Sequence, residues 1–336
     1  MKKLLRLAVV VAIAMVVGRH YGLPLPAIDL PSVELPAVSL PAPFSSLAKG
    51  QGEGSEEPET APAETAGAPV GVVSATPVAA APQDAGQREF ASRIEAGLTD
   101  VRGKIDVSGL DVGVDDGVEI YKQVLASHPE VFWTSGGCSY TYDDTGLLTL
   151  SPDYLYDASK VPAMRASYED AAGRAVQFAS GAGSDEDKAK ALHDYLVENS
   201  EYSRTAIAGG QVPMVEHTAY GVLVGGEGVC DGYSRAYQDL LGRVGITSVV
   251  VESRPMYHAW NMVSLGGSWY HVDVTYDDPI IWGSNGTVVH DDEVRADFFL
   301  KSDAYMQAHE HYGWTTDLRA TDTSLDAKAD WKVFRG

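Results

Sequence analysis

The chain has 336 residues, of which 45% are hydrophobic, so it is long enough and apolar enough to bury a full core. Its 47 acidic and 25 basic residues give a formal net charge of −22, which argues against a protein that binds nucleic-acid phosphates through clustered lysine and arginine. The acidity otherwise favours solubility and repels anionic surfaces, and it identifies no ligand.

The N-terminus has the pattern of an export signal. A basic segment, MKKLLR, is followed by an unbroken apolar run from Leu7 to Val17. A membrane-spanning helix needs about 20 apolar residues, whereas this run has the length of a signal-peptide core. No clear small-residue cleavage site follows in GRHYG. We therefore expect residues 1–20 to be a signal peptide or a signal anchor in contact with the membrane. The protein is expected to be extracytoplasmic, either secreted or anchored at the membrane or cell surface.

Residues 21–87 have the composition of a linker. Prolines recur at every fifth position from Pro26 to Pro41, a spacing that excludes a helix and favours an extended spacer. From Ala48 to Gln87 there is no aromatic residue, so this stretch cannot bury enough apolar surface to offset its ordering entropy. The sequence predicts a Pro-rich, disordered stalk; a binding motif within the proline repeat is the alternative.

The folded region is expected from residue 88 onward, with an N-terminal α/β extension over residues 88–165. Helical spacing occurs over 88–102 and again over 118–133, and residues 138–154 alternate around a DDTG turn, which indicates a hairpin. A helix is expected over 163–180, and the next helix begins at Ser184, an N-cap residue followed by three acidic residues. The extension could be a cover, a binding domain or part of one continuous fold.

Residues 166–336 contain the most clearly patterned unit. After Cys230, apolar residues recur at helical spacing as far as Val244, and Gly245 stands where a helix-terminating glycine is expected. Residues 246–253 read as a buried strand, and two further strands on either side of Gly266-Gly267 read as a β-hairpin. A helix packed across one face of an antiparallel sheet is an α+β arrangement.

Three residues of this unit have the chemistry of a thiol enzyme. Cys230 lies at a helix N-terminus, where the helix dipole is expected to lower the thiol pKa. Cys230 also lies on the apolar stripe of this helix, which is expected to face the sheet. His258 lies on the first strand of the hairpin and Asp273 on the second. The three residue types correspond to a nucleophile, a general base and a group that orients the base.

The register of the hairpin decides how closely the base and the carboxylate pair. A turn centred between residues 265 and 266 places His258 directly opposite Asp273. A turn centred between residues 266 and 267 places Trp260 opposite Asp273 and His258 on the diagonal of the same face. In either register the carboxylate reaches the imidazole.

Three blocks, GVCDGYSRAYQDLL, HAWNMV and WYHVDVTYDDP, resemble the core motifs of the transglutaminase-like superfamily, within the wider papain-like thiol enzymes. The order of the residues and their spacings of 28 and 15 positions are similar to those of its bacterial extracellular members. The resemblance implies a papain/transglutaminase-like core with Cys230 as nucleophile, His258 as general base and acid, and Asp273 as its orienter. The family includes transamidating enzymes, proteases, amide hydrolases and inactive members.

An acyl-transfer enzyme also needs donors for the oxyanion. The backbone N–H of Cys230 is one expected donor, because it lies at a helix start. Side chains that could supply a second donor, or contact the substrate, are Trp260, Tyr202 and Tyr220. His271 shares a face with Asp273 and is the rival base, whereas Asn261 alternates away from that face and is expected to satisfy local backbone.

Other roles for these residues compete with catalysis. A disulfide between Cys138 and Cys230 is chemically permissible in an exported protein, and either thiol could instead be an ordinary buried cysteine. HDDE at 290–293 and HEH at 309–311 could bind ions, but adjacent residues seldom converge on one cation, and no zinc, calcium-loop or nucleotide-binding motif is present. We therefore expect neither a metal nor another cofactor.

The sequence thus predicts an exported, cysteine-dependent acyl-transfer enzyme that acts on amide bonds of peptides, proteins or cell-wall material. Its reaction would be hydrolysis or transamidation through a thioester. The alternative is a catalytically silent surface module that keeps the fold for binding or as a scaffold.

Overall fold

The computed structural model describes residues 66–67, 84–278, 280–282, 288–290 and 294–335. The predicted export signal, almost all of the predicted stalk and residues 291–293 of the HDDE motif lie outside these residues. Strand β1 (Ala66–Gly67) is an exception within the stalk, because it pairs with residues 139 and 140. No helix within the described part of the chain is long and apolar enough to cross a membrane.

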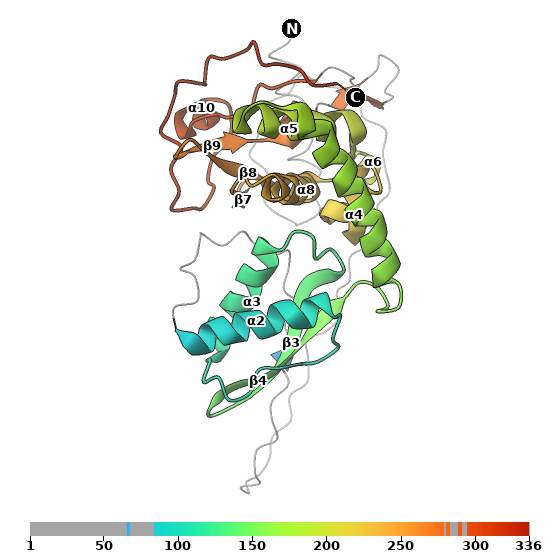
Figure 1. Cartoon of the computed structure of the whole chain (residues 1–336), viewed down its shortest axis with the longest axis vertical. Helices are drawn as coiled ribbons and strands as arrows, with labels where there is room; N and C mark the ends of the chain where they lie inside the picture. Colours follow the sequence, from blue (N-terminus) through green and yellow to red (C-terminus); the bar gives the residue numbers. More distant parts are fainter. Residues whose placement is uncertain (1–65, 68–83, 279, 283–287, 291–293, 336) are drawn as a thin grey trace, which may run out of the picture. The chain divides into compact units, whose positions relative to one another are not determined.

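The N-terminal extension is a helix pair on a small sheet. Helices α2 (Ala85–Thr99) and α3 (Val114–Ser127) accompany the hairpin of β3 (Thr134–Asp143) and β4 (Gly146–Tyr154), as Figure 1 shows. With β1 and β2 (Ile105–Asp106) these strands form a sheet in the order β1-β3-β4-β2. The predicted helices and hairpin are confirmed, but α2 begins at Ala85, inside the predicted linker, and α3 ends at Ser127 rather than at residue 133. Phe90, Ile94 and Leu150 belong to the buried cluster between them.

Two long helices follow. Helix α4 (Val161–Phe178) continues into a 3₁₀ turn, η1 (Ala179–Gly181), and α5 (Asp185–Asn199) begins where the Ser184 side chain accepts a hydrogen bond from the Asp187 backbone N–H. Both predicted helices are therefore confirmed, as is the N-cap at Ser184. The boundary that we place between residues 165 and 166 falls inside α4.

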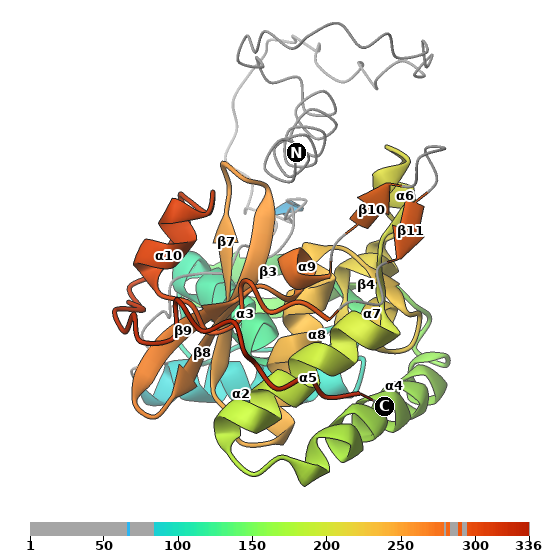
Figure 2. The same cartoon turned by 90° about the horizontal axis from the view of Figure 1, so that it is seen from above.

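The second half of the chain builds a helix-on-sheet layer. Helix α8 (Cys230–Arg243) packs against a three-stranded antiparallel sheet of β7 (Ser248–Ser253), β8 (His258–Leu265) and β9 (Ser268–Val272). Figure 2 shows α8 and α5 beside these orange strands. Gly245 ends the helix with a φ of 80°, a left-handed conformation that favours glycine. The predicted α+β class is confirmed.

Short elements connect these layers and border the N-terminus of α8. Before the helix come β5 (Glu201–Tyr202), α6 (Arg204–Ile207), η2 (Met214–His217), α7 (Ala219–Leu223) and β6 (Glu227–Gly228). After the sheet come α9 (Val274–Asp277), β10 (Ile280–Trp282), β11 (Val288–His290) and α10 (Asp303–Ala308). Of these segments, η2, α7, β6 and α9 contact α8, whereas α10 contacts β9.

The extension shares packing with the helix-on-sheet part. Phe132 and Trp133 belong to the same buried cluster as residues of α4, α5 and α8. The Gln238 side chain of α8 donates a hydrogen bond to the Ala126 carbonyl of α3 over 3.1 Å. The described residues within 65–336 accordingly belong to one compact unit.

Candidate active site

Cys230 is the first residue of α8, and its position depends on close backbone packing. The backbone N–H of Val229 donates to the carbonyl of Glu216, which binds the start of the helix to η2. A Cβ on Gly232 would lie 2.5 Å from the same carbonyl oxygen, so only glycine permits this approach. Gly232 therefore lets the start of α8, and with it Cys230, lie close to η2.

Cys230 is a half-buried residue whose thiol lies beside the Ala259 backbone N–H at the start of strand β8. Backbone hydrogen bonds from Ala259 and Asp231 favour its thiolate, but burial is the larger effect and raises the thiol pKa far above its ordinary value. The carboxylates of Asp231 and Asp273 raise it further. The pKa of the Cys230 thiol is therefore raised rather than lowered as the sequence predicts, because desolvation outweighs the two backbone hydrogen bonds at the start of the helix.

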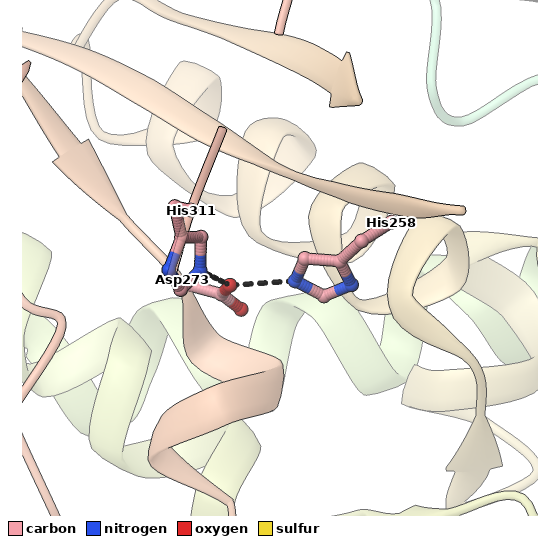
Figure 3. Close-up of side chains that lie close together, drawn as sticks. All are labelled: His258, Asp273 and His311. Carbon is pink, nitrogen blue, oxygen red and sulfur yellow. Dashed lines mark hydrogen bonds and ion pairs between the residues drawn. The ribbon is translucent and has the colours of Figure 1, made fainter. Parts of the chain in front are cut away.

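His258 and Asp273 form a short hydrogen bond. The ring Nε2 of His258 lies 2.6 Å from Oδ2 of Asp273, as Figure 3 shows. The β8–β9 ladder pairs Leu265 with Ser268 and Asn261 with Val272. One position further along the same register, Trp260 is opposite Asp273. The hairpin turn is therefore centred between residues 266 and 267, which is the second of the two registers that the sequence allows. Asp273 follows the strand directly and caps α9, where its side chain accepts from the Tyr276 N–H over 3.1 Å.

The surroundings of Asp273 hold it as a carboxylate. Its side chain is fully buried, which opposes ionisation, yet the charges and hydrogen bonds of His258 and His311 lower its pKa below the ordinary range. His258 itself is nearly buried and stacks on Trp260 at 5.6 Å between ring centroids. Because Nε2 of His258 faces the carboxylate, Nδ1 is the ring atom left to accept a proton from another group.

His311 is a site residue that the sequence reasoning missed. Its Nε2 lies 2.9 Å from the same Oδ2 of Asp273, on the side opposite His258 (Figure 3). It belongs to the HEH segment, which we considered only for ion binding. The sequence shows a histidine at position 311, but no spacing or pattern relates residue 311 to residue 273. Only the fold brings them together.

His271, the rival base, has no free ring nitrogen. Its Nδ1 accepts a hydrogen bond from the indole N–H of Trp260 at 2.9 Å, and its Nε2 donates to Asp303 at 2.8 Å. Burial lowers the pKa of His271, so the ring is neutral in this setting. The expectation that Trp260 donates to an oxyanion is therefore wrong, because its N–H is already bound.

Of the other two donor candidates, Tyr202 lies at the site and Tyr220 lies in the core. Strand β5 pairs with β6 so that Tyr202 is opposite Gly228, two residues before Cys230. Burial raises the pKa of Tyr202, and the charge of Cys230 is the next largest cause. Tyr220 packs on Phe132 with ring centroids 4.5 Å apart. The structure thus brings Tyr202, not Tyr220, to the thiol.

Asn261 connects the helix to the sheet. Its side-chain amide donates to the Ser234 carbonyl of α8 over 2.9 Å and approaches the Ser248 hydroxyl at 3.3 Å. The expectation that it satisfies backbone is confirmed, but the partner lies in another element rather than nearby in the sequence. This bond fixes the spacing between α8 and β8.

Asp231 pairs with His217, a second pair that sequence reasoning did not find. The Nδ1 of His217 lies 3.0 Å from Oδ2 of Asp231. Burial opposes protonation of His217, but the hydrogen bond and charge of Asp231 raise its pKa above the ordinary value. The pair flanks the start of α8 and partly neutralises the carboxylate next to the thiol.

A buried polar cluster supports the α9 side of the site. The two ring nitrogens of His193 lie 3.0 Å from Asp194 and 3.1 Å from Asp277, and Asp277 also accepts from the Phe298 N–H. Lys190 donates to the same Asp194 oxygen, Oδ1, that His193 contacts. Burial opposes protonation of His193, but both carboxylates raise its pKa. This cluster anchors α9 immediately after Asp273.

The two cysteines do not form a disulfide. Both are free thiols, and Cys138 lies in the hydrophobic cluster of the extension. Burial raises the pKa of Cys138 to about 11. The disulfide alternative is thus contradicted, and Cys138 is a buried thiol.

A cation could be held only by displacing existing hydrogen bonds. The ligand atoms of His258, Asp273 and His311 lie within 4.8 Å of one another. However, Oδ2 of Asp273 lies between the two ring nitrogens and accepts from both. The three side chains therefore satisfy one another as a hydrogen-bonded set.

Comparison with known proteins supports the resemblance found in the motifs. Residues 172–274 match the model of the Transglutaminase-like superfamily. No curated protein matches the sequence. Two solved structures have partial likeness. One, described as a TGase, has a TM-score of 0.30 and 16% identity over 41% of this chain and 43% of that chain. The other, a candidate protease from Parabacteroides distasonis, has a TM-score of 0.24 and 12% identity over 44% of this chain and 33% of that chain.

This chain spans less than half of either structure, and neither bears on its activity. The matched segment, in contrast, includes Cys230, His258 and Asp273, together with the helix and the sheet that carry them. Residues 172–274 of this chain form a domain of the transglutaminase-like superfamily.

Proposed function

We propose that this protein is a cysteine-dependent acyl-transfer enzyme that acts on amide bonds of peptides, proteins or cell-wall material. Cys230 is its nucleophile, His258 its general base and acid, and Asp273 the residue that orients His258. The observation that supports this most is the 2.6 Å bond between His258 Nε2 and the buried Asp273 carboxylate. That bond fixes the Nε2–H tautomer and leaves Nδ1 as a proton acceptor.

The reaction follows from these positions. Nδ1 of His258 takes the thiol proton as the Cys230 sulfur attacks the carbonyl carbon of the amide. The oxyanion is stabilised by the backbone N–H of Cys230 and the hydroxyl of Tyr202. The C–N bond then breaks, His258 returns the proton to the leaving amine, and a thioester remains on the sulfur. Water or a second amine attacks the thioester and loses a proton to His258, which releases an acid or a new amide and restores the thiol.

The raised thiol pKa also favours the alternative function, a silent binding or scaffold module. A cysteine that is only buried reacts slowly with alkylating agents, whereas one served by a base reacts quickly. The two functions therefore differ in the reactivity of Cys230 at low pH and in its dependence on His258.

The test is alkylation with iodoacetamide, followed by mass spectrometry of the two cysteine peptides. At pH 6, Cys230 is expected to react at least ten times faster than Cys138, and His258→Ala is expected to remove the difference. His128→Ala, which changes a partly exposed histidine of the extension, is the matched control. Equal and slow labelling of both thiols would support the silent module. Ammonia release on addition of a primary amine, without peptide cleavage, would indicate transamidation.

We also propose that the protein is exported. The basic segment and the apolar run at residues 7–17 support this. Cell fractionation of the full chain is expected to place it outside the cytoplasm, and replacing two residues of the run by aspartate is expected to retain it inside.

A further inference from the structure

His311 shares the Asp273 carboxylate with His258, and none of the three transglutaminase-like blocks of the sequence includes it. We propose that His311 is a positioning residue of the active site, held as an imidazolium that fixes and counter-charges the Asp273 carboxylate behind His258. This rests on the proposed function, because it assigns a task within the same triad. His311 acts through Asp273.

The protons that His311 carries follow from its partners. Nε2 lies 2.9 Å from Oδ2 of Asp273, and Nδ1 lies 3.1 Å from the backbone carbonyl oxygen of His309. Both partners only accept hydrogen bonds. A neutral imidazole has a single N–H and would leave one of these pairs as two facing acceptors. Both contacts are satisfied only when both ring nitrogens carry protons.

The neighbouring His271 provides an internal contrast. It is equally buried, but its Nδ1 faces a donor, the indole N–H of Trp260, and its Nε2 faces the acceptor Asp303. One N–H satisfies both of its contacts, so His271 is neutral. The same cluster therefore contains two fully buried histidines with different proton counts, as set by their partners.

The surroundings of His311 accommodate a buried cation. Its ring is fully buried, and the rings of Tyr276 and Phe298 lie 4.6 Å and 4.8 Å away between centroids. The bonded Asp273 carboxylate compensates the charge, as a buried ion requires. The titratable groups that face or adjoin the ring are Asp273, His258, Tyr276, His271 and Glu310.

The backbone adopts an unfavourable conformation to present this ring. Helix α10 ends so that the N–H groups of His309 and His311 both donate to the Met306 carbonyl. Between them Glu310 has a φ of 68°, in the left-handed region that non-glycine residues seldom adopt. This turn directs the His309 carbonyl toward Nδ1 of His311.

Two consequences follow for the proposed triad. Asp273 accepts from His258, His311 and the Tyr276 N–H, so its carboxylate cannot rotate away from the base. The positive charge of His311 also offsets the negative charge of Asp273. An imidazolium at His311 therefore reduces the net negative charge that lies beside His258.

The number of protons on the His311 ring can be measured in a protein variant that lacks the proposed nucleophile. In Cys230→Ala protein labelled with ¹⁵N, long-range ¹H–¹⁵N spectra report the protonation of each ring nitrogen. His311 is expected to show two protonated nitrogens at pH 7 and His271 only one, with signals assigned by their loss in His311→Gln and His271→Gln. A single protonated nitrogen on His311 would overturn the proposal, whatever the protein catalyses.

The consequence for reactivity is tested by Cys230 alkylation from pH 5 to pH 9. His311→Gln keeps a donor toward Asp273 but removes the charge, so the midpoint of the rate profile is expected to rise by about one pH unit. His311→Phe also removes the donor, and its maximal rate is expected to fall at least tenfold. His128→Gln is the matched control and is expected to leave the profile unchanged.

The outcomes separate the two proposals. If His258→Ala slows alkylation but both His311 variants keep the wild-type profile, the role of His311 is refuted and the proposed function stands. If His258→Ala has no effect either, the proposed function fails, and the NMR proton count decides on its own whether His311 is an imidazolium. Should His311→Phe fail to fold, the near-isosteric His311→Gln still gives the shift in the profile.

Discussion

Asp273→Asn is the sharpest perturbation of this site, because the two carboxylate oxygens have different partners. Oδ1 accepts the Tyr276 N–H, whereas Oδ2 accepts from both His258 and His311. Asparagine offers one oxygen and one NH₂ group. If the oxygen stays toward Tyr276, the NH₂ group opposes two ring N–H groups. If it turns toward the histidines, the NH₂ group opposes the backbone N–H.

The magnitudes follow from burial. Removing one partner of a fully buried ionic set costs about 3–5 kcal/mol in the free energy of unfolding, because the remaining charge is left without compensation. The base also loses its tautomer and orientation, for which a loss of about 10²–10⁴-fold in rate is expected. Asp273→Asn should therefore lower both stability and Cys230 reactivity.

The assay pairs urea unfolding with the rate of Cys230 alkylation at pH 7, and Asp303→Asn is the matched control. Asp303 also bonds a buried histidine, but His271 and the Ala320 N–H both approach the same oxygen, Oδ1. An asparagine oxygen can keep both bonds, so stability is expected to change by less than about 1 kcal/mol and the alkylation rate not at all. Wild-type alkylation by a folded Asp273→Asn protein would refute the reasoning.

Three further predictions concern other contacts of the site. Tyr202→Phe is expected to lower amide turnover by about 10²–10³-fold and to leave iodoacetamide alkylation unchanged, since only the first reaction forms an oxyanion; comparing the two rates checks this. Gly232→Ala is expected to destabilise the protein by about 1–3 kcal/mol in urea unfolding, because its Cβ would meet the Glu216 carbonyl at 2.5 Å. Gly242→Ala, which has open space, should stabilise the same helix by about 0.5–1 kcal/mol, and equal effects would refute the packing argument. The pKa of His193 is raised on folding, so its stabilisation is complete below its unfolded value of 6.5 and is lost as pH rises through the higher folded value. Urea unfolding should show falling stability above pH 6.5, and His193→Gln should flatten that slope; an unchanged slope would contradict the assignment.

Local patterns predicted the elements that carry the site. The helical stripe after Cys230 corresponds to α8, the alternating segments around Gly266-Gly267 correspond to β8 and β9, and Ser184 caps α5. These features depend on spacing and on side chains within one segment, so they can be read from the sequence. Strand β1 could not be predicted, because it forms by pairing with β3 and its own composition resembles a linker.

The residues of the site also divide into those that the local sequence predicts and those that only the fold brings together. The sequence placed His258 near Asp273 because both lie on one hairpin, whose connection is short. It could not place His311, which reaches Asp273 from the end of α10. It also offered the Trp260 N–H as one of three candidate oxyanion donors, whereas the fold gives that donor to His271.

By itself, the sequence determined the α+β class and the placing of His258 near Asp273, because periodicity and short-range register act within a few turns or one hairpin. It also contained the three residue types of the proposed triad, in blocks that resemble transglutaminase-like motifs. Only the tertiary structure decided the electrostatics. Desolvation of Cys230, the sharing of Asp273 by two histidines and the neutral state of His271 arise from groups far apart in the chain. Charge stabilisation depends on which dipoles and charges lie within a few ångströms, and that proximity exists only once the chain is folded.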